Sequence, residues 1–160
     1  GYRVIVGDSP LKGSHRVSLT LEHEPPKGAA LFHISNGNTW SFLSSEHDST
    51  TFTGAIGSSA LIAVLSDTIE PYVMPLAPKP GSTIRSNQPI LKAYVEDKGA
   101  GIGSSDSISM TIDGIPVYEA HTVQYRLYNP LDKGSHTIVV SVTDRVGNTR
   151  TRSWMFTVGQ

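Results

Sequence analysis

The chain has no cysteine and no long apolar run. The absence of cysteine excludes a disulfide framework and a thiolate metal site. The apolar stretch at residues 61–65 is far shorter than the roughly 20 residues that a helix needs to span a bilayer. We therefore expect no insertion into a membrane.

The chain also lacks an excess of charge of either sign. Its 13 Lys and Arg side chains nearly balance its 14 Asp and Glu side chains, which gives a formal net charge of −1 at pH 7. Such a balance creates no field that would attract nucleic acid or an anionic membrane. We expect neither as a partner, and we expect the excised chain to be monomeric.

Strand patterns dominate what is present. Apolar Val17, Leu19 and Leu21 alternate with polar neighbours, whereas no run of ten residues combines helical apolar spacing with a cap. Near the end of the chain, alternation in residues 138–142 resumes in residues 154–158 after a segment with turn chemistry at 144–148. The sequence predicts an all-β fold, with this hairpin closing a β-sandwich.

Four prolines at positions 71, 75, 78 and 80 divide the chain. Such a density of proline disfavours a continuous central strand and favours an extended, semi-rigid connector. We therefore predict two tandem antiparallel β-sandwich domains, at residues 1–70 and 82–160, joined by a proline-rich linker at 71–81. In the first domain Asn36-Gly37 is a hairpin signal, and in the second Asp113-Gly114 is another.

Four motifs follow one another in the second half at sensible spacings: residues 97–102 (DKGAGI), residues 107–114 (SISMTIDG), residues 134–136 (GSH) and residues 143–148 (TDRVGN). Together they resemble bacterial immunoglobulin-like (Ig-like) domains of cell-surface and periplasmic proteins. The first half is similar to a β-sandwich accessory module that often precedes such a domain. The resemblance implies a non-catalytic region of a large extracellular, cell-surface or periplasmic bacterial protein, whose partners are the neighbouring domains of that protein.

Catalytic and zinc-binding readings find less support in the sequence. Ser, His and Asp all occur, but there is no G-x-S-x-G elbow, and His136 alternates with apolar residues as a packed or paired strand residue would. The segment Glu46-His47-Asp48 clusters three potential metal ligands without the spacing of a helical zinc motif. We expect no catalytic residues and no cofactor.

Calcium is an alternative that the second half leaves open. Glu96, Asp97, Asp106 and Asp144 supply carboxylate oxygens in or beside its loops, and sandwich domains often gather calcium ligands where loops converge. Aspartates at such positions also form turns through hydrogen bonds from their side chains to the backbone. The sequence favours the turn role and keeps these residues as calcium candidates.

Carbohydrate binding is the second alternative. Tyr118 and Tyr128 are tyrosines that we expect to be exposed, and aromatic rings can stack on the apolar faces of sugars. The leading expectation is a structural spacer or protein-interaction region of a larger protein. The alternative is a carbohydrate-binding or adhesion module, accessory to an enzyme that acts on cell walls or polysaccharides.

Overall fold

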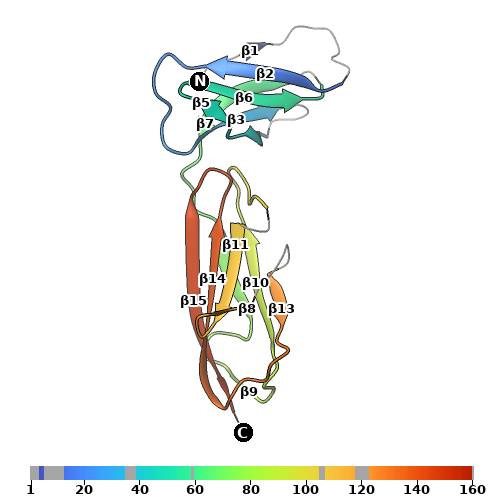
Figure 1. Cartoon of the computed structure of the whole chain (residues 1–160), viewed down its shortest axis with the longest axis vertical. Coiled ribbons are helices and arrows are strands. Elements are labelled where there is room, and N and C mark those ends of the chain that lie inside the picture. The colour runs from blue at the N-terminus through green and yellow to red at the C-terminus, as the bar shows by residue number, and fades with distance from the viewer. Residues whose placement is uncertain are drawn as a thin grey trace. The chain divides into compact units, whose positions relative to one another are not determined.

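A computed structural model describes residues 4–5, 13–34, 39–58, 60–104, 107–117 and 123–159. These residues form largely antiparallel sheets with connecting turns and loops, so the predicted all-β class is confirmed (Figure 1). Contacts divide the chain into two compact units, Gly1–Ile69 with Arg145–Gly147, and Glu70–Asp144 with Asn148–Gln160. The predicted Asn36-Gly37 turn lies outside the described residues.

The first unit contains two sheets, with strand orders β1-β7-β3-β4 and β2-β6-β5. All of their pairings are antiparallel. The strands are β1 (Val4–Ile5), β2 (His15–Thr20), β3 (Ala29–Ile34), β4 (Ser41–Ser44), β5 (His47–Asp48), β6 (Thr51–Ile56) and β7 (Leu61–Ser66).

The core of the first unit takes side chains from both of its sheets. Leu19 of β2 and Phe52 of β6 pack with Leu31 of β3 and Ile62 of β7 in one buried cluster. These positions follow the period-2 alternation that places every second side chain of a strand on one face. The arrangement is compatible with a β-sandwich.

The second unit also contains two sheets, with strand orders β13-β10-β8 and β12-β11-β14-β15-β9. Its pairings are antiparallel except for β15 and β9, which run parallel. The strands are β8 (Tyr72–Ala77), β9 (Thr83–Ile84), β10 (Ile90–Glu96), β11 (Ile108–Ile112), β12 (Ile115–Pro116), β13 (Gln124–Arg126), β14 (Gly134–Thr143) and β15 (Thr149–Val158).

The hairpin β14–β15 is the longest element of this unit, with ten residues in each strand. Its register runs from Gly134 opposite Val158 to Thr143 opposite Thr149, which confirms the predicted turn between the two strands. The inward face carries apolar side chains that are buried against residues of the other sheet. This core comprises Val73, Leu91, Ala93, Ile108, Met110, Ile112, Val123, Leu127, Ile138, Val140, Val142, Trp154, Phe156 and Val158.

The proline-rich segment 71–81, which we expected to be a linker, contains strand β8. This strand pairs with β10 and stands at the edge of its sheet. An edge strand needs main-chain hydrogen bonds on one side only, so a proline within it is tolerated. Pro75 lies opposite Ala93, where the register shifts. The segment is therefore part of the second unit rather than a free connector.

No helix in the described part of the chain has the length and apolar character that crossing a bilayer requires.

Candidate functional site

The side chain of His136, near the start of β14, is hydrogen-bonded through both of its ring nitrogens. It is buried, with 8% of its surface exposed, and its ring lies against that of Phe156 with centroids 5.6 Å apart. The ring atom Nδ1 is 2.7 Å from Oδ2 of Asp113, and Nε2 is 2.9 Å from the carbonyl oxygen of Asp132. Both partners are acceptors, so both bonds form only when the imidazole is protonated.

The pKa values of the two partners shift in opposite directions. Burial alone would lower the pKa of His136, but the hydrogen bonds to Asp113 and to the Asp132 carbonyl raise it above the usual 6.5. Burial alone would raise the pKa of Asp113, but the hydrogen bonds from His136 and from the Thr137 amide lower it below 3.8. The two side chains therefore form an ion pair at mildly acidic pH, between the usual pKa of Asp113 and that of His136.

This geometry leaves His136 without a nitrogen for catalysis. A histidine that activates a serine needs one ring nitrogen to accept the serine proton. Here one nitrogen is held by Asp113 and the other by Asp132. The residue acts as a cross-link between β14 and the β11–β12 turn.

That turn is a tight one formed by Asp113 and Gly114, which have φ angles of +51° and +82°. Positive φ at both central residues is the requirement of a type I′ hairpin, which Asp-Gly meets. Ile112 pairs with Ile115 across it, so the predicted hairpin is confirmed. Oδ1 of Asp113 accepts a bond of 2.8 Å from the Thr137 amide, which ties the turn to the strand β14.

Two of the four calcium candidates lie together in the second unit. Carboxylate oxygens of Asp97 and Asp144 are within 4.8 Å of each other. Oδ2 of Asp97 accepts hydrogen bonds from the amides of Gly99 and Gly101, at 3.0 and 2.6 Å. Asp144 accepts bonds of 2.8 and 2.7 Å from the amide and the side chain of Asn148. Both residues thus have the turn-forming bonds that the sequence favoured.

Of the other two calcium candidates, only Glu96 lies among the described residues, and it is not in this cluster. Glu96 ends β10 opposite Tyr72, and Asp106 lies outside the described residues. A calcium ion takes about six to eight oxygen ligands. The calcium alternative therefore stays a prediction, while the hydrogen bonds show that Asp97 and Asp144 each stabilise a turn.

Of the two carbohydrate candidates, Tyr128 is the one that the structure describes. It is 77% exposed, and its ring meets that of Tyr125 edge to face with centroids 6.1 Å apart. Tyr118 lies outside the described residues. The exposure that we expected of Tyr128 is confirmed.

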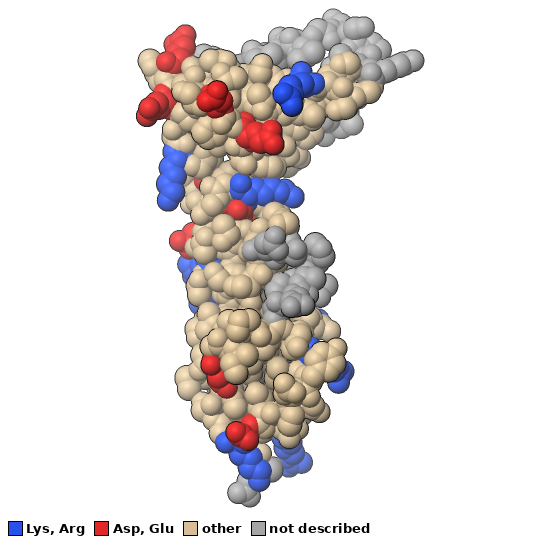
Figure 2. Space-filling view, viewed as in Figure 1, with Lys and Arg blue, Asp and Glu red and all other residues tan. Residues whose placement is uncertain are grey.

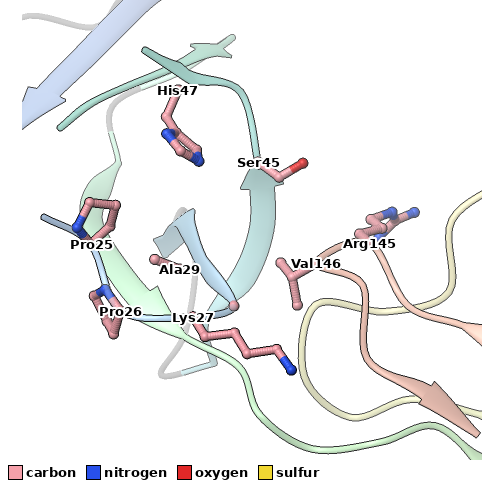
Figure 3. Close-up of a pocket in the computed structure, with 9 residues that line it drawn as sticks. Pro25, Pro26, Lys27, Ala29, Ser45, His47, Arg145 and Val146 are labelled. Carbon is pink, nitrogen blue, oxygen red and sulfur yellow. The ribbon is translucent and has the colours of Figure 1, made fainter. Parts of the chain in front are cut away.

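In the first unit, Glu46, His47 and Asp48 do not converge. Among the described residues these three bring no set of ligand atoms within 4.8 Å of one another. Instead the ring of His47 lies 4.8 Å from that of Phe52, and its Nδ1 is 3.1 Å from the carbonyl oxygen of Ser49. Figure 3 shows the His47 ring pointing toward a hollow that is bordered by Pro25 and Pro26.

Sequence reasoning missed one exposed surface. Tyr72 of β8 and Tyr94 of β10 project from the solvent face of their sheet, with ring centroids 6.5 Å apart. Tyr72 is 55% exposed and Tyr94 is 44% exposed, and Met74 lies beside them opposite Tyr94. We expected residues 71–81 to form a linker rather than a strand. The sequence therefore gave no reason to place Tyr72 beside a residue of β10.

A comparison with protein-family models finds no match, and a comparison with curated proteins finds none either.

Proposed function

We propose that this chain is a non-catalytic structural region of a larger bacterial cell-surface or secreted protein, in which an Ig-like domain in the second half acts as a spacer. Two tandem β-sandwiches would make up this region. The domains that flank it in the parent protein are the proposed partners, and the bacterial cell surface, the periplasm or the extracellular medium is the proposed location.

The observation that carries the proposal is the path of the chain through the second unit. The first and last strands of the unit run side by side in the same direction. Glu70 and Arg150 form an ion pair of 2.9 Å at one end, and Trp154 Nε1 donates a bond of 2.9 Å to the Pro78 carbonyl farther along. At the other end the Gly159 amide donates a bond of 2.8 Å to the Ile84 carbonyl.

A parallel first and last strand means that the chain enters the unit at one end and leaves it at the opposite end. The ten residues of β15 cover roughly 30 Å at about 3.3 Å per residue. Domains built in this way can be strung in series, each adding its length to the separation between its neighbours. This is the geometry that a spacer requires.

The Ig-like assignment is supported by the turns and hydrogen bonds that residues of the four sequence motifs form. Asp97 organises the loop that follows β10, and Asp113 and Gly114 make the β11–β12 turn. His136 pairs with Asp113, and Asp144 closes the β14–β15 turn through Asn148. Residues that lie far apart in the sequence thus act on one another, which supports reading the motifs as one family pattern.

The non-catalytic part of the proposal rests on the engagement of His136 by two acceptors and on the turn-forming roles of the acidic residues. The absence of nucleic acid from the proposed partners rests on the net charge of −1. On the face shown in Figure 2, basic and acidic side chains are interspersed, which agrees with that balance.

Single-molecule stretching of the full chain tests the spacer role. With handles on the two chain ends, the force acts along the parallel strands β9 and β15. The hydrogen bonds between these two strands are then loaded in shear, all at the same time. The matched control pulls between residues 133 and 159, which flank the Gly134–Val158 pair and so unzip the β14–β15 hairpin bond by bond. We expect the second unit to yield at a clearly higher force in the first geometry. Equal forces in the two geometries would count against a load-bearing spacer.

A further inference from the structure

The surface formed by Tyr72, Met74, Tyr94, Lys92 and Arg126 is hereafter called the tyrosine face. Its members lie on the solvent side of the sheet β13-β10-β8. On β10, Lys92 and Tyr94 are two residues apart and so share one face. Met74 pairs with Tyr94 and lies two residues from Tyr72, and Gln124 pairs with Lys92 and lies two residues from Arg126, so all five side chains are on that face. All five side chains are exposed. Large apolar side chains gathered on one face of a soluble domain mark a binding surface more often than scattered ones do.

A groove of about 340 Å³ borders this face along the edge of β8. It is lined by Tyr72 and Met74 on one side and by Arg150 and Arg152 of β15 on the other. Glu70 also lines it, and its carboxylate is held by Arg150 at 2.9 Å. The groove therefore combines an aromatic wall with a wall on which Glu70 pairs with Arg150 and Arg152 remains without an ion-pair partner among the described residues.

We propose that the tyrosine face and this groove bind a linear polysaccharide whose sugar units carry carboxylates. The inference goes beyond the spacer role and does not depend on it. The rings of Tyr72 and Tyr94 offer surfaces on which the apolar faces of sugars can stack, while their hydroxyl groups hydrogen-bond to sugar hydroxyls. The two rings are inclined by 62°. Such an angle suits consecutive sugars of a twisting, soluble chain better than a flat crystalline surface.

Charge gives the reason for an anionic chain. In the part of the chain that the structure describes, Lys92, Arg126 and Arg152 form no ion pair. All three side chains are exposed. They outnumber Glu96, the carboxylate that the register places opposite Tyr72 on the same face. Carboxylates are natural partners for such cations, and arginine can bind them with two parallel hydrogen bonds.

A peptide strand fits the same place less well. A peptide that added to the edge of β8 would need an uninterrupted row of main-chain donors and acceptors. Pro75 lies within β8 and has no N–H, so that row is broken. The exposed side chains, rather than the strand edge, are therefore the binding elements.

Affinity electrophoresis and calorimetry of the full chain with polygalacturonate test the proposal, with neutral dextran as the matched polymer. We expect binding to polygalacturonate that weakens as salt is raised, and no binding to dextran. Tyr72→Ala and Tyr94→Ala should each weaken the affinity by roughly five- to tenfold. Arg152→Gln should also weaken it, whereas Tyr94→Phe should retain most of it because the stacking ring remains.

Met155→Ala and Arg85→Gln are the control variants, since they remove an exposed apolar and an exposed basic side chain from outside the tyrosine face. Tyr128→Ala tests the carbohydrate candidate that the sequence offered elsewhere. A melting curve of each variant checks that it is folded. The absence of binding to polygalacturonate would overturn the proposal, as would equal binding to dextran or a loss of binding in Tyr128→Ala but not in Tyr94→Ala. Binding of peptides from an array that requires Tyr94, without polysaccharide binding, would assign the face to a protein partner and would overturn it too.

Discussion

The imidazole Nδ1 of His136 lies 2.7 Å from Oδ2 of Asp113, although the two residues are 23 positions apart in the sequence. This pair joins the turn between β11 and β12 to the first residues of β14. Because Nε2 of the same ring bonds to the Asp132 carbonyl at 2.9 Å, the protonated imidazole fixes three segments of the second unit.

The stability of the second unit should therefore depend on pH in a defined direction. The pKa of His136 is raised above 6.5 in the folded protein, so its contribution is complete below that value and is lost as the pH rises through the folded-state pKa. The pKa of Asp113 is lowered below 3.8, so its contribution is present above that value and is lost as the pH falls through the folded-state pKa.

Thermal unfolding of the native chain and of His136→Gln between pH 3 and pH 9 measures this effect. The free energy of unfolding of the native chain should exceed that of the variant by about 1 kcal/mol from roughly pH 4 to pH 6.5. This difference should shrink toward pH 3 and toward pH 9. The magnitude is modest because the carboxylate of Asp113 is 41% exposed and is screened by water. A difference that grows from pH 6 to pH 9 would contradict the assignment.

Gly28→Ala should be strongly destabilising in the first unit. Gly28 has a φ angle of +72°, and a Cβ atom there would lie 2.1 Å from the carbonyl oxygen of Asp67. The Asp67 amide also donates a bond of 2.9 Å to the Gly28 carbonyl, so the two segments cannot separate freely. We expect a loss of at least about 2 kcal/mol in denaturant unfolding. Gly57→Ala is the matched control, since no atom lies within 4 Å of its added Cβ, and a similar loss there would refute the steric reason.

Trp154→Phe tests the link between β15 and the segment that follows β8. The indole Nε1 donates a bond of 2.9 Å to the Pro78 carbonyl, and the side chain is 5% exposed. Phenylalanine keeps most of the packing but leaves that carbonyl without its donor, which should cost about 1 to 2 kcal/mol in chemical denaturation. Met155→Leu, at a position that is 55% exposed, should change stability very little. Equal effects of the two substitutions would show that the hydrogen bond does not matter.

Each unit has its own core, so core substitutions should act locally. Phe52 is fully buried in the first unit and Phe156 is 1% exposed in the second. We expect Phe52→Ala and Phe156→Ala each to cost about 3 to 5 kcal/mol in the unit that contains them. Differential scanning calorimetry should show that each variant lowers a different transition. A single transition that both variants lower equally would contradict the division into two units.

Period-2 alternation and turn chemistry made much of this fold predictable. Ile138, Val140 and Val142 alternate as β14 requires, and the Asp113-Gly114 dipeptide specifies its turn through local backbone preferences. Both signals act between near neighbours in the chain. They are therefore visible without knowledge of how the strands are arranged in sheets.

The remaining features depend on pairing between distant segments. β8 was not predicted because its prolines are compatible with a strand only at the edge of a sheet. The local sequence does not show whether a strand will lie at an edge. The proximity of Tyr72 to Tyr94 follows from the register of β8 on β10. Likewise, alternation suggested that His136 is packed or paired, but only the fold identifies Asp113 as its partner.

The most direct test of the central claim is the distance between the two ends of the second unit, measured by pulsed electron spin resonance. The chain has no cysteine, so Lys98→Cys and Arg85→Cys place the only two spin labels, on exposed residues near the entry and exit ends. A spacer whose first and last strands run parallel predicts one narrow distance peak at roughly 30 Å or more. A peak well below about 20 Å, or a broad distribution, would contradict entry and exit at opposite ends.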